Sequence, residues 1–206
     1  MTNILMAKVS IRGIRFLAWH HFGVDALPLE SKERAGVAGN DPTEWQRSVL
    51  MDEDRQLYLL PTYFFGCIKA GGRTVKRGKG NLLTAIASTL QVIDDQILIL
   101  NGSGVLALPD PPEVIEAGTR KADKLPAAFV EVIGVRNPST KARNIRYRVV
   151  AKPGWHCEFK ILWDKTVVDR GAMQLAVTYA GQLVGLGDGR GSIGYGRFEV
   201  ETFDIQ

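Results

Sequence analysis

The stretch Trp-His-Cys-Glu-Phe-Lys-Ile-Leu-Trp at residues 155–163 shows the most regular alternation of side chains in the chain. Apolar side chains occupy every odd-numbered position, and His156, Glu158 and Lys160 lie between them. Successive side chains in a β-strand point to opposite faces, so this pattern is typical of a strand with one buried face. The stretch therefore predicts a core strand in a sheet whose other face is polar.

The segments around this strand give an ordered series of helices and strands. Residues 170–184 carry apolar side chains at helical spacing, and Pro61 opens another helix that Gly71 and Gly72 end. The predicted core strands are 5–12, 129–136, 155–163 and 195–203, and the predicted core helices are 61–70 and 170–184. The resulting strand–helix–strand–strand–helix–strand order is the split βαβ order of ferredoxin-like folds.

The predicted fold class is α+β, a ferredoxin-like or RNA-recognition-motif-like antiparallel sheet with helices on one face. We expect residues 1–206 to form a single domain with insertions at about 20–56 and 71–128. RNA-recognition folds bind single strands on their open sheet face. In the predicted register, the side chains on that face that suit nucleic-acid binding are Lys8, Arg12, His156 and Lys160.

Positive charge is segregated along the chain, although the net charge is only +4. Residues 55–93 contain no Asp or Glu, and the basic residues there include Lys69, Arg73, Lys76, Arg77 and Lys79. A second acid-free stretch, residues 136–152, contains Lys141, Arg143, Arg146 and Arg148. Such segregation indicates a surface that binds a polyanion. The alternative interpretation is two solvated loops that happen to be basic.

Composition narrows the class of protein. No apolar run approaches the roughly 20 residues of a membrane span, and the first residues do not resemble a signal peptide. Cys67 and Cys157 are far apart and form no disulfide framework, which favours a reducing cytoplasm. The cysteines and histidines also lack the spacing of metal ligands. We therefore expect a cytoplasmic protein that has no metal and no membrane partner.

The segment Gly-Leu-Gly-Asp-Gly-Arg-Gly-Ser-Ile-Gly-Tyr-Gly-Arg-Phe at residues 185–198 is the most specific motif. It is no dinucleotide fingerprint, because it precedes a strand instead of opening a helix, and it has no P-loop lysine. Glycines allow backbone amides to approach a phosphate closely, which makes candidates of Gly187, Gly189, Gly191 and the basic residues Arg190 and Arg197. The alternative is a long turn that needs positive φ angles.

Two segments resemble motifs of the CRISPR-associated RAMP superfamily. Gly185-Leu186-Gly187 and Gly194-Tyr195-Gly196 match the two ends of its C-terminal glycine-rich loop, with a spacer of six residues where five is usual. Residues 60–70 resemble the family's helix start and keep Pro61 and Gly66, but the Gly-Ser pair that follows the proline in the family is missing. The two motifs and the strand order cover about half of the chain.

The resemblance is closest to the guide-RNA-coating backbone subunits of that superfamily. It implies binding of single-stranded guide RNA by its phosphates, partners that are copies of the same chain and other effector subunits, and no bound cofactor. A phage or mobile-element relative that binds another single strand fits the sequence equally well, and the residues do not distinguish RNA from single-stranded DNA.

Two other functions stay open at this point. RAMP endoribonucleases use a histidine placed after the first strand as a general base without metal, which makes His20 and His21 candidates for catalysis. The expected place of that histidine is a helix, however, and the first predicted core helix begins only at Pro61. The other function is a structural one, a virion or filament protein whose basic loops bind an acidic neighbour.

Overall fold

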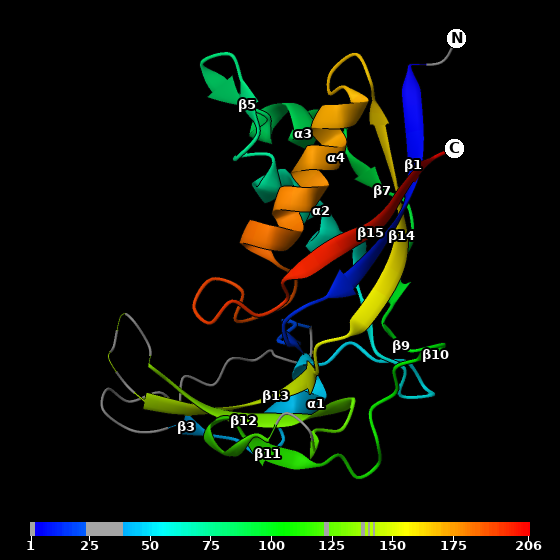
Figure 1. The fold of residues 1–206 in the computed structure, drawn as a ribbon. Helices are drawn as coiled ribbons and strands as arrows, with labels where there is room; N and C mark the ends of the chain where they lie inside the picture. Colours follow the sequence, from blue (N-terminus) through cyan, green and yellow to red (C-terminus); the bar gives the residue numbers. More distant parts are fainter. Residues whose placement is uncertain (1–2, 24–38, 122–123, 137–138, 140, 142) are drawn as a thin grey trace.

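The computed structural model describes residues 3–23, 39–121, 124–136, 139, 141 and 143–206. Part of the first predicted insertion, residues 24–38, lies outside the described residues. The described chain forms an α+β structure with two main sheets, one above the other in Figure 1. No helix in the described parts of the chain is long and apolar enough to cross a membrane.

The first sheet is built around β1, which is hydrogen-bonded on both sides. Its register with β14 places Val9 opposite Phe159, and the paired strands in this sheet are antiparallel. The strands are β1 (Ile4–Gly13), β7 (Gln91–Val92), β9 (Leu100–Asn101), β10 (Gly104–Val105), β14 (Trp155–Asp164) and β15 (Phe198–Ile205). The alternation at residues 155–163 is confirmed, since every odd position is buried.

Helices cover one face of this sheet (Figure 1). They are α2 (Pro61–Gly71), α3 (Leu83–Thr89) and α4 (Arg170–Tyr179), which continues as a π-helical turn over Ala180–Val184. Phe64 of α2 packs on Phe159 of β14 with ring centroids 4.6 Å apart. Asp169 caps α4 by accepting a hydrogen bond from the amide of Ala172. The main core therefore lies between the helices and the odd-numbered face of β14.

The second sheet was not expected from the sequence. It contains β2 (Leu17–Ala18), β3 (Gly39–Asn40), β11 (Val114–Glu116), β12 (Ala128–Arg136) and β13 (Arg143–Ala151). The antiparallel pairing of β12 and β13 extends over the full length of both strands, so these two strands form its centre. The short helix α1 (Glu44–Ser48) lies against β13.

The prediction that residues 129–136 form a core strand of the first sheet was wrong. These residues pair with β13 in the second sheet, and the short strand β7 takes the edge position next to β14. The order β7-β14-β1-β15, with α2 between β1 and β7 and α4 between β14 and β15, is compatible with a ferredoxin-like arrangement. β12 pairs with β13 because the two strands are neighbours in the sequence. Their hairpin closes a short loop, which costs less conformational entropy than pairing with a distant strand.

Shorter strand pairs complete the structure. β4 (Tyr58–Leu59) pairs with β8 (Ile97–Leu98), and β5 (Lys76–Arg77) pairs with β6 (Gly80–Asn81) in a hairpin at one end of the molecule (Figure 1). A 3-10 turn spans Ala117–Thr119. Residues 71–128, which were expected to form an insertion, thus contribute strands to both main sheets.

Replacing Gly71 with alanine tests the contact between α2 and α4. A Cβ at this position would lie 2.3 Å from the carbonyl oxygen of Ala176 and 2.6 Å from the amide nitrogen of Ala180. Backbone atoms of a packed helix cannot move aside alone, so we expect Gly71→Ala to lower the free energy of unfolding by about 2–3 kcal/mol in urea denaturation.

The matched control for this substitution is Gly66→Ala in the same helix. A Cβ at Gly66 would meet nothing within 4 Å. We expect this variant to keep its stability or gain about 0.5–1 kcal/mol, because alanine favours the helix. Equal stability of the two variants would contradict the close approach of α2 and α4.

Candidate nucleic-acid interface

The glycine loop, residues 185–196, is held in a closed shape by its own backbone. Five of its six glycines have positive φ angles, and the amide of Leu186 donates to the carbonyl of Gly196 over 2.9 Å. A Cβ at Gly196 would lie 1.8 Å from the carbonyl oxygen of Leu186. The amide of Asp188 also donates to the carbonyl of Ala18 over 2.8 Å, which fixes the loop to β2. Turn geometry therefore explains most of the glycines.

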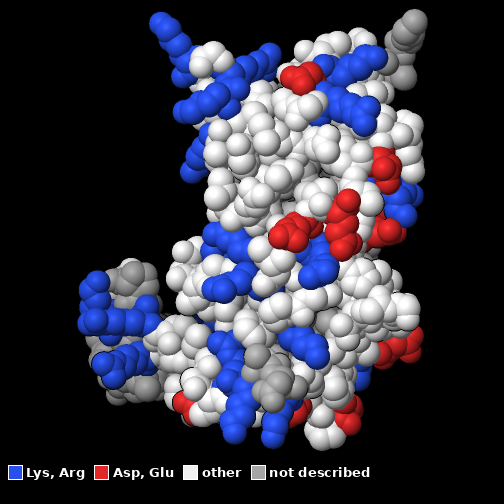
Figure 2. Space-filling view, in the orientation of Figure 1, with Lys and Arg blue, Asp and Glu red and all other residues white. Residues whose placement is uncertain are grey.

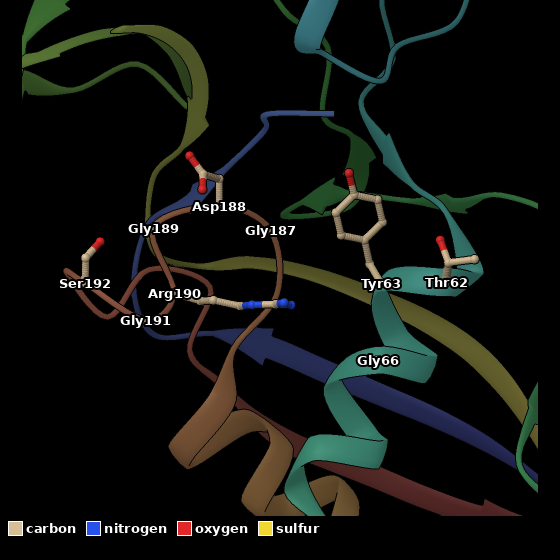
Figure 3. Close-up of a pocket in the computed structure, with 9 residues that line it drawn as sticks. All are labelled: Thr62, Tyr63, Gly66, Gly187, Asp188, Gly189, Arg190, Gly191 and Ser192. Atoms are coloured by element: carbon tan, nitrogen blue, oxygen red, sulfur yellow. The ribbon is translucent and has the colours of Figure 1, made fainter. Parts of the chain in front are cut away.

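A first hollow of about 410 Å³ lies between this loop and the start of α2. Thr62, Tyr63 and Gly66 line it from the helix, and residues 187–192 line it from the loop. Figure 3 shows the Arg190 side chain extending from the loop toward α2. The structure thus brings together the two segments that carry the RAMP resemblance, which are separated by more than a hundred residues in the sequence.

Part of the outer turn of the loop, residues 190–192, lines this hollow. The amide of Ile193 donates to the carbonyl of Gly189 over 3.0 Å, which closes a single turn. Within the described chain, the amides of Arg190, Gly191 and Ser192 donate to no other residue. Backbone amides beside a guanidinium form a site that suits an anion.

A second hollow of about 400 Å³ lies between the glycine loop and the second sheet. Asp188, Gly189 and Ser192 line both hollows, so the loop stands between them. The remaining lining of the second hollow comes from β12 and β13, from His20 and from the loop, namely Ile133, Gly134, Val135, Arg136, Arg146, Arg148 and Ile193. This hollow combines apolar walls with basic side chains.

Arg148 lies in a buried ion-pair network instead of facing solvent. Its residue is 5% exposed, and its guanidinium pairs with Asp188 of the glycine loop and, over 3.7 Å, with Glu131 of β12. Glu131 is fully buried and also pairs with Arg120 over 2.7 Å and accepts a hydrogen bond from Tyr195 over 2.8 Å. The charge pattern of the sequence places Arg148 among the basic residues of a polyanion-binding surface, and that role stays a prediction; in the structure its guanidinium is engaged by Asp188 and by its cross-strand neighbour Glu131.

The network keeps Asp188 ionised. Burial by itself would raise the pKa of this carboxyl, but the charge and hydrogen bond of Arg148 outweigh it and lower the pKa below its ordinary value. The amide of Gly189 and the neighbouring His20 act in the same direction. A negative charge therefore stands between the two hollows, a feature that the sequence did not reveal.

The second sheet carries three arginines of the acid-free stretch 136–152, namely Arg136, Arg143 and Arg146. Arg146 lines the second hollow, keeps 35% of its side chain exposed and pairs with Glu44 over 2.6 Å. Arg143 is exposed at the start of β13. Arg136 is exposed and lines the second hollow, and it was absent from the predicted site although it opens the acid-free stretch. Figure 2 shows Lys and Arg side chains gathered around this end of β12 and β13.

The other basic stretch forms a separate surface at the far end of α2. Arg73, Lys76, Arg77 and Lys79 are exposed in and beside the β5–β6 hairpin, where blue atoms gather in Figure 2. Lys76 and Arg77 line a small hollow with Lys165, and Arg77 donates to the carbonyl of Val167 over 3.1 Å. Lys69 lies further back on α2, with its ammonium 5.5 Å from the Phe65 ring centre. The eleven residues of α2 span about 16 Å, which separates this surface from the glycine loop.

The open face of the first sheet, which was predicted to supply Lys8, Arg12, His156 and Lys160, is of mixed charge. Lys8 pairs with Glu158 over 2.6 Å, and the register places Asp204 opposite Lys8 and Glu199 opposite Arg12. Glu158 belongs to β14, whereas Asp204 and Glu199 come from β15, whose neighbour in the sheet was not predictable from the local pattern. Figure 2 shows acidic side chains along this strand.

Arg197 follows the loop and lies outside both hollows. Its carbonyl accepts from the amide of Ile14 over 2.9 Å, and its Nη1 is buried without a hydrogen-bond partner among the described residues. Cys67 donates to the carbonyl of Gly185 over 3.2 Å, and burial raises the pKa of its thiol to about 12. This thiol therefore stays protonated and packs the loop against α2.

His20 and His21 lie closer to the site than their place in the sequence indicated. His20 lines the second hollow, and His21 Nδ1 lies 3.2 Å from the hydroxyl of Tyr63, which lines the first. The sequence argued against a catalytic role because these histidines precede the first predicted core helix, and in the structure they follow β2 and lie on no helix. Across the described ranges, no three His, Cys, Asp or Glu side chains are grouped as metal ligands would be.

Comparison with known proteins finds a likeness of fold. The chain is similar to a chain in the cryo-EM structure of the Type III-B Cmr-beta bound to cognate target RNA, with 13% identity and a TM-score of 0.51. The match covers 98% of this chain and 60% of that one, so this chain spans well under two thirds of its length. No family model and no curated protein sequence matches. The likeness is one of fold and is consistent with the RAMP-like fold that the motifs indicated.

Removing the charge of Arg148 tests the buried network. We expect Arg148→Met to lower the free energy of unfolding by about 3–5 kcal/mol, because Glu131 loses a partner in a fully buried position. Arg146→Met on the same strand is the control and should cost about 1 kcal/mol or less, because that ion pair is partly solvated.

A double-mutant cycle with Glu131→Gln completes this test in urea denaturation. The double variant should lose less stability than the sum of the two single variants, because the neutral amide introduced on β12 no longer needs the charge of Arg148. Additive losses would show that the two side chains do not interact.

Proposed function

We propose that this chain binds single-stranded RNA by its phosphate backbone, as a repeating subunit of a CRISPR-type ribonucleoprotein in the cytoplasm. The observation that carries the proposal is the pair of adjoining hollows at the glycine loop, which combine basic side chains with backbone amides that donate to no other described residue. The fold likeness to a chain of an RNA-bound Cmr complex supports it.

The chemistry of the first hollow suits a phosphate. Arg190 supplies a guanidinium, which binds phosphate oxygens through paired hydrogen bonds. The amides of residues 190–192 add uncharged donors, and the first turn of α2 adds the partial positive charge of a helix N-terminus. Arg136 and Arg146 continue the positive charge along the second hollow.

The second hollow has the composition of a base-binding surface. Ile133 and Ile193 supply apolar walls, and a guanidinium such as that of Arg146 stacks well on a nucleobase. Single strands expose both their phosphates and their bases, whereas a duplex hides the bases. A single strand that crosses the glycine loop would use both hollows, which favours single-stranded over double-stranded RNA.

The exposed residues of the β5–β6 hairpin extend the proposed surface to a second contact with the same strand. The partners that follow from the RAMP resemblance are copies of this chain along one guide RNA, together with other effector subunits. This arrangement accounts for basic surfaces at two separate places on the molecule.

A second candidate function is metal-independent cleavage of guide-RNA precursor. The positions of His20 beside Asp188 and of His21 beside Tyr63 favour it, because both histidines adjoin the hollows where the strand would lie. A histidine near a carboxylate is a suitable general base.

Charge removal at the two hollows tests binding. We expect the double variant Arg136→Ala, Arg190→Ala to bind single-stranded RNA of any sequence about tenfold or more weakly, because phosphate contacts are independent of sequence. The slope of log affinity against log salt should also become shallower by about 1.4, since each lost phosphate contact contributes about 0.7.

The control for this experiment is Arg12→Ala on the open face of the first sheet, where Glu199 lies opposite. This variant should keep nearly the affinity and the salt slope of the unmodified protein in fluorescence anisotropy. A larger loss of affinity from Arg12→Ala than from the double variant would indicate that the strand binds on the sheet face instead.

Incubation with a repeat hairpin RNA and a chelator separates the two candidate functions. If the chain only coats RNA, the hairpin stays intact on a denaturing gel. A single defined cut that disappears in the His20→Ala, His21→Ala double variant would establish the nuclease instead.

A further inference from the structure

Asp188 is a carboxylate at the centre of a site that otherwise suits anions. It lines both hollows, the first together with Arg190 and the second together with Arg146, and 38% of its side chain is exposed. A carboxylate repels phosphate oxygens and weakens binding unless it meets a different group of the ligand. Its presence at this position therefore needs a reason beyond phosphate binding.

The carboxylate is fixed in place and keeps its charge. The backbone of Asp188 is anchored to Ala18, and its side chain pairs with Arg148 and accepts from the amide of Gly189. An ionised carboxylate offers about four lone-pair directions, and it can only accept hydrogen bonds. These two partners leave directions free toward solvent at the ridge of the loop.

The ligand group that best suits such an acceptor is an uncharged hydroxyl donor. A ribonucleotide carries one at the 2′ position of its sugar, between the phosphate and the base, and deoxyribose lacks it. Asp188, Gly189 and Ser192 line both hollows and form the ridge between them. The first hollow suits a phosphate and the second suits a base, so a nucleotide that occupies both hollows places its sugar over this ridge. Asp188 is the acidic residue of that ridge.

We propose that Asp188 accepts a hydrogen bond from a ribose 2′-hydroxyl and thereby makes this site selective for RNA over single-stranded DNA. The inference rests on the proposed binding of a single strand at the glycine loop and adds the sugar that the site selects. Arg148 is then a positioning residue, because it holds the carboxylate in place and does not itself reach the sugar.

The test compares three oligonucleotides of one sequence by fluorescence anisotropy at fixed salt: RNA, DNA, and RNA with fluorine in place of each 2′-hydroxyl. We expect the unmodified protein to bind RNA about tenfold more tightly than either of the others, which is the size expected for a hydrogen bond to a charged acceptor. The fluorinated strand separates the loss of the donor from a change in sugar pucker.

The variant Asp188→Asn keeps the shape and the pairing distance to Arg148 while it removes the charge. It should narrow the preference for RNA to about threefold or less and bind DNA at least as well as the unmodified protein, because repulsion of phosphate is relieved. The control is Asp204→Asn, an exposed acid on β15, which should leave the RNA-to-DNA ratio unchanged. Thermal unfolding establishes that both variants are folded.

The outcomes separate this inference from the proposed function. Equal binding of RNA and DNA by the unmodified protein would overturn the role of Asp188 while leaving single-strand binding intact. An RNA preference that persists in Asp188→Asn would assign the selection to other residues and also overturn the inference. Absence of binding to all three strands would remove both proposals.

Discussion

The ion pairs of Arg148 with Glu131 and Asp188 are the interaction on which the site depends. Glu131 belongs to the second sheet and Asp188 to the glycine loop, which itself joins the last helix to the last strand of the first sheet. Arg148 thus connects the second sheet to the glycine loop. A buried charge is costly without a partner, so each of these side chains fixes the position of the others. The separation between loop and second sheet, and hence the second hollow, follows from this pairing.

The glycine loop illustrates how one segment serves shape and binding together. Most of its glycines are needed for positive φ or for close contact with Phe16, Ala18 and its own backbone. Gly191 is different, since it has neither a positive φ nor a crowded surrounding. It lines the first hollow. The glycines that the loop conformation requires and the turn around Gly191 that suits a ligand are therefore adjacent but distinct.

The function of the basic stretches can be judged only from their positions on the folded surface. The two acid-free stretches do not form one basic face, because α2 separates the β5–β6 hairpin from the glycine loop. On the open sheet face, acidic residues of β15 lie among Lys8 and Arg12. The strongest combination of donors is instead at the glycine loop, where His20 and His21 also lie. The binding surface that we propose is thus a junction between elements and not the face of a sheet.

The sequence by itself determined the strands at residues 5–12 and 155–163, both core helices and the unusual conformation of the glycine segment. Alternation, helical spacing and glycine content are local properties, and the apolar sides of these elements must be buried wherever the chain folds. Only the tertiary structure decided that residues 129–136 belong to a second sheet, that Arg148 points inward, and that Asp188 stands between two hollows. Those outcomes depend on which strand lies beside which. The pairing register between segments that are distant in the sequence decides which side chain lies opposite a basic residue.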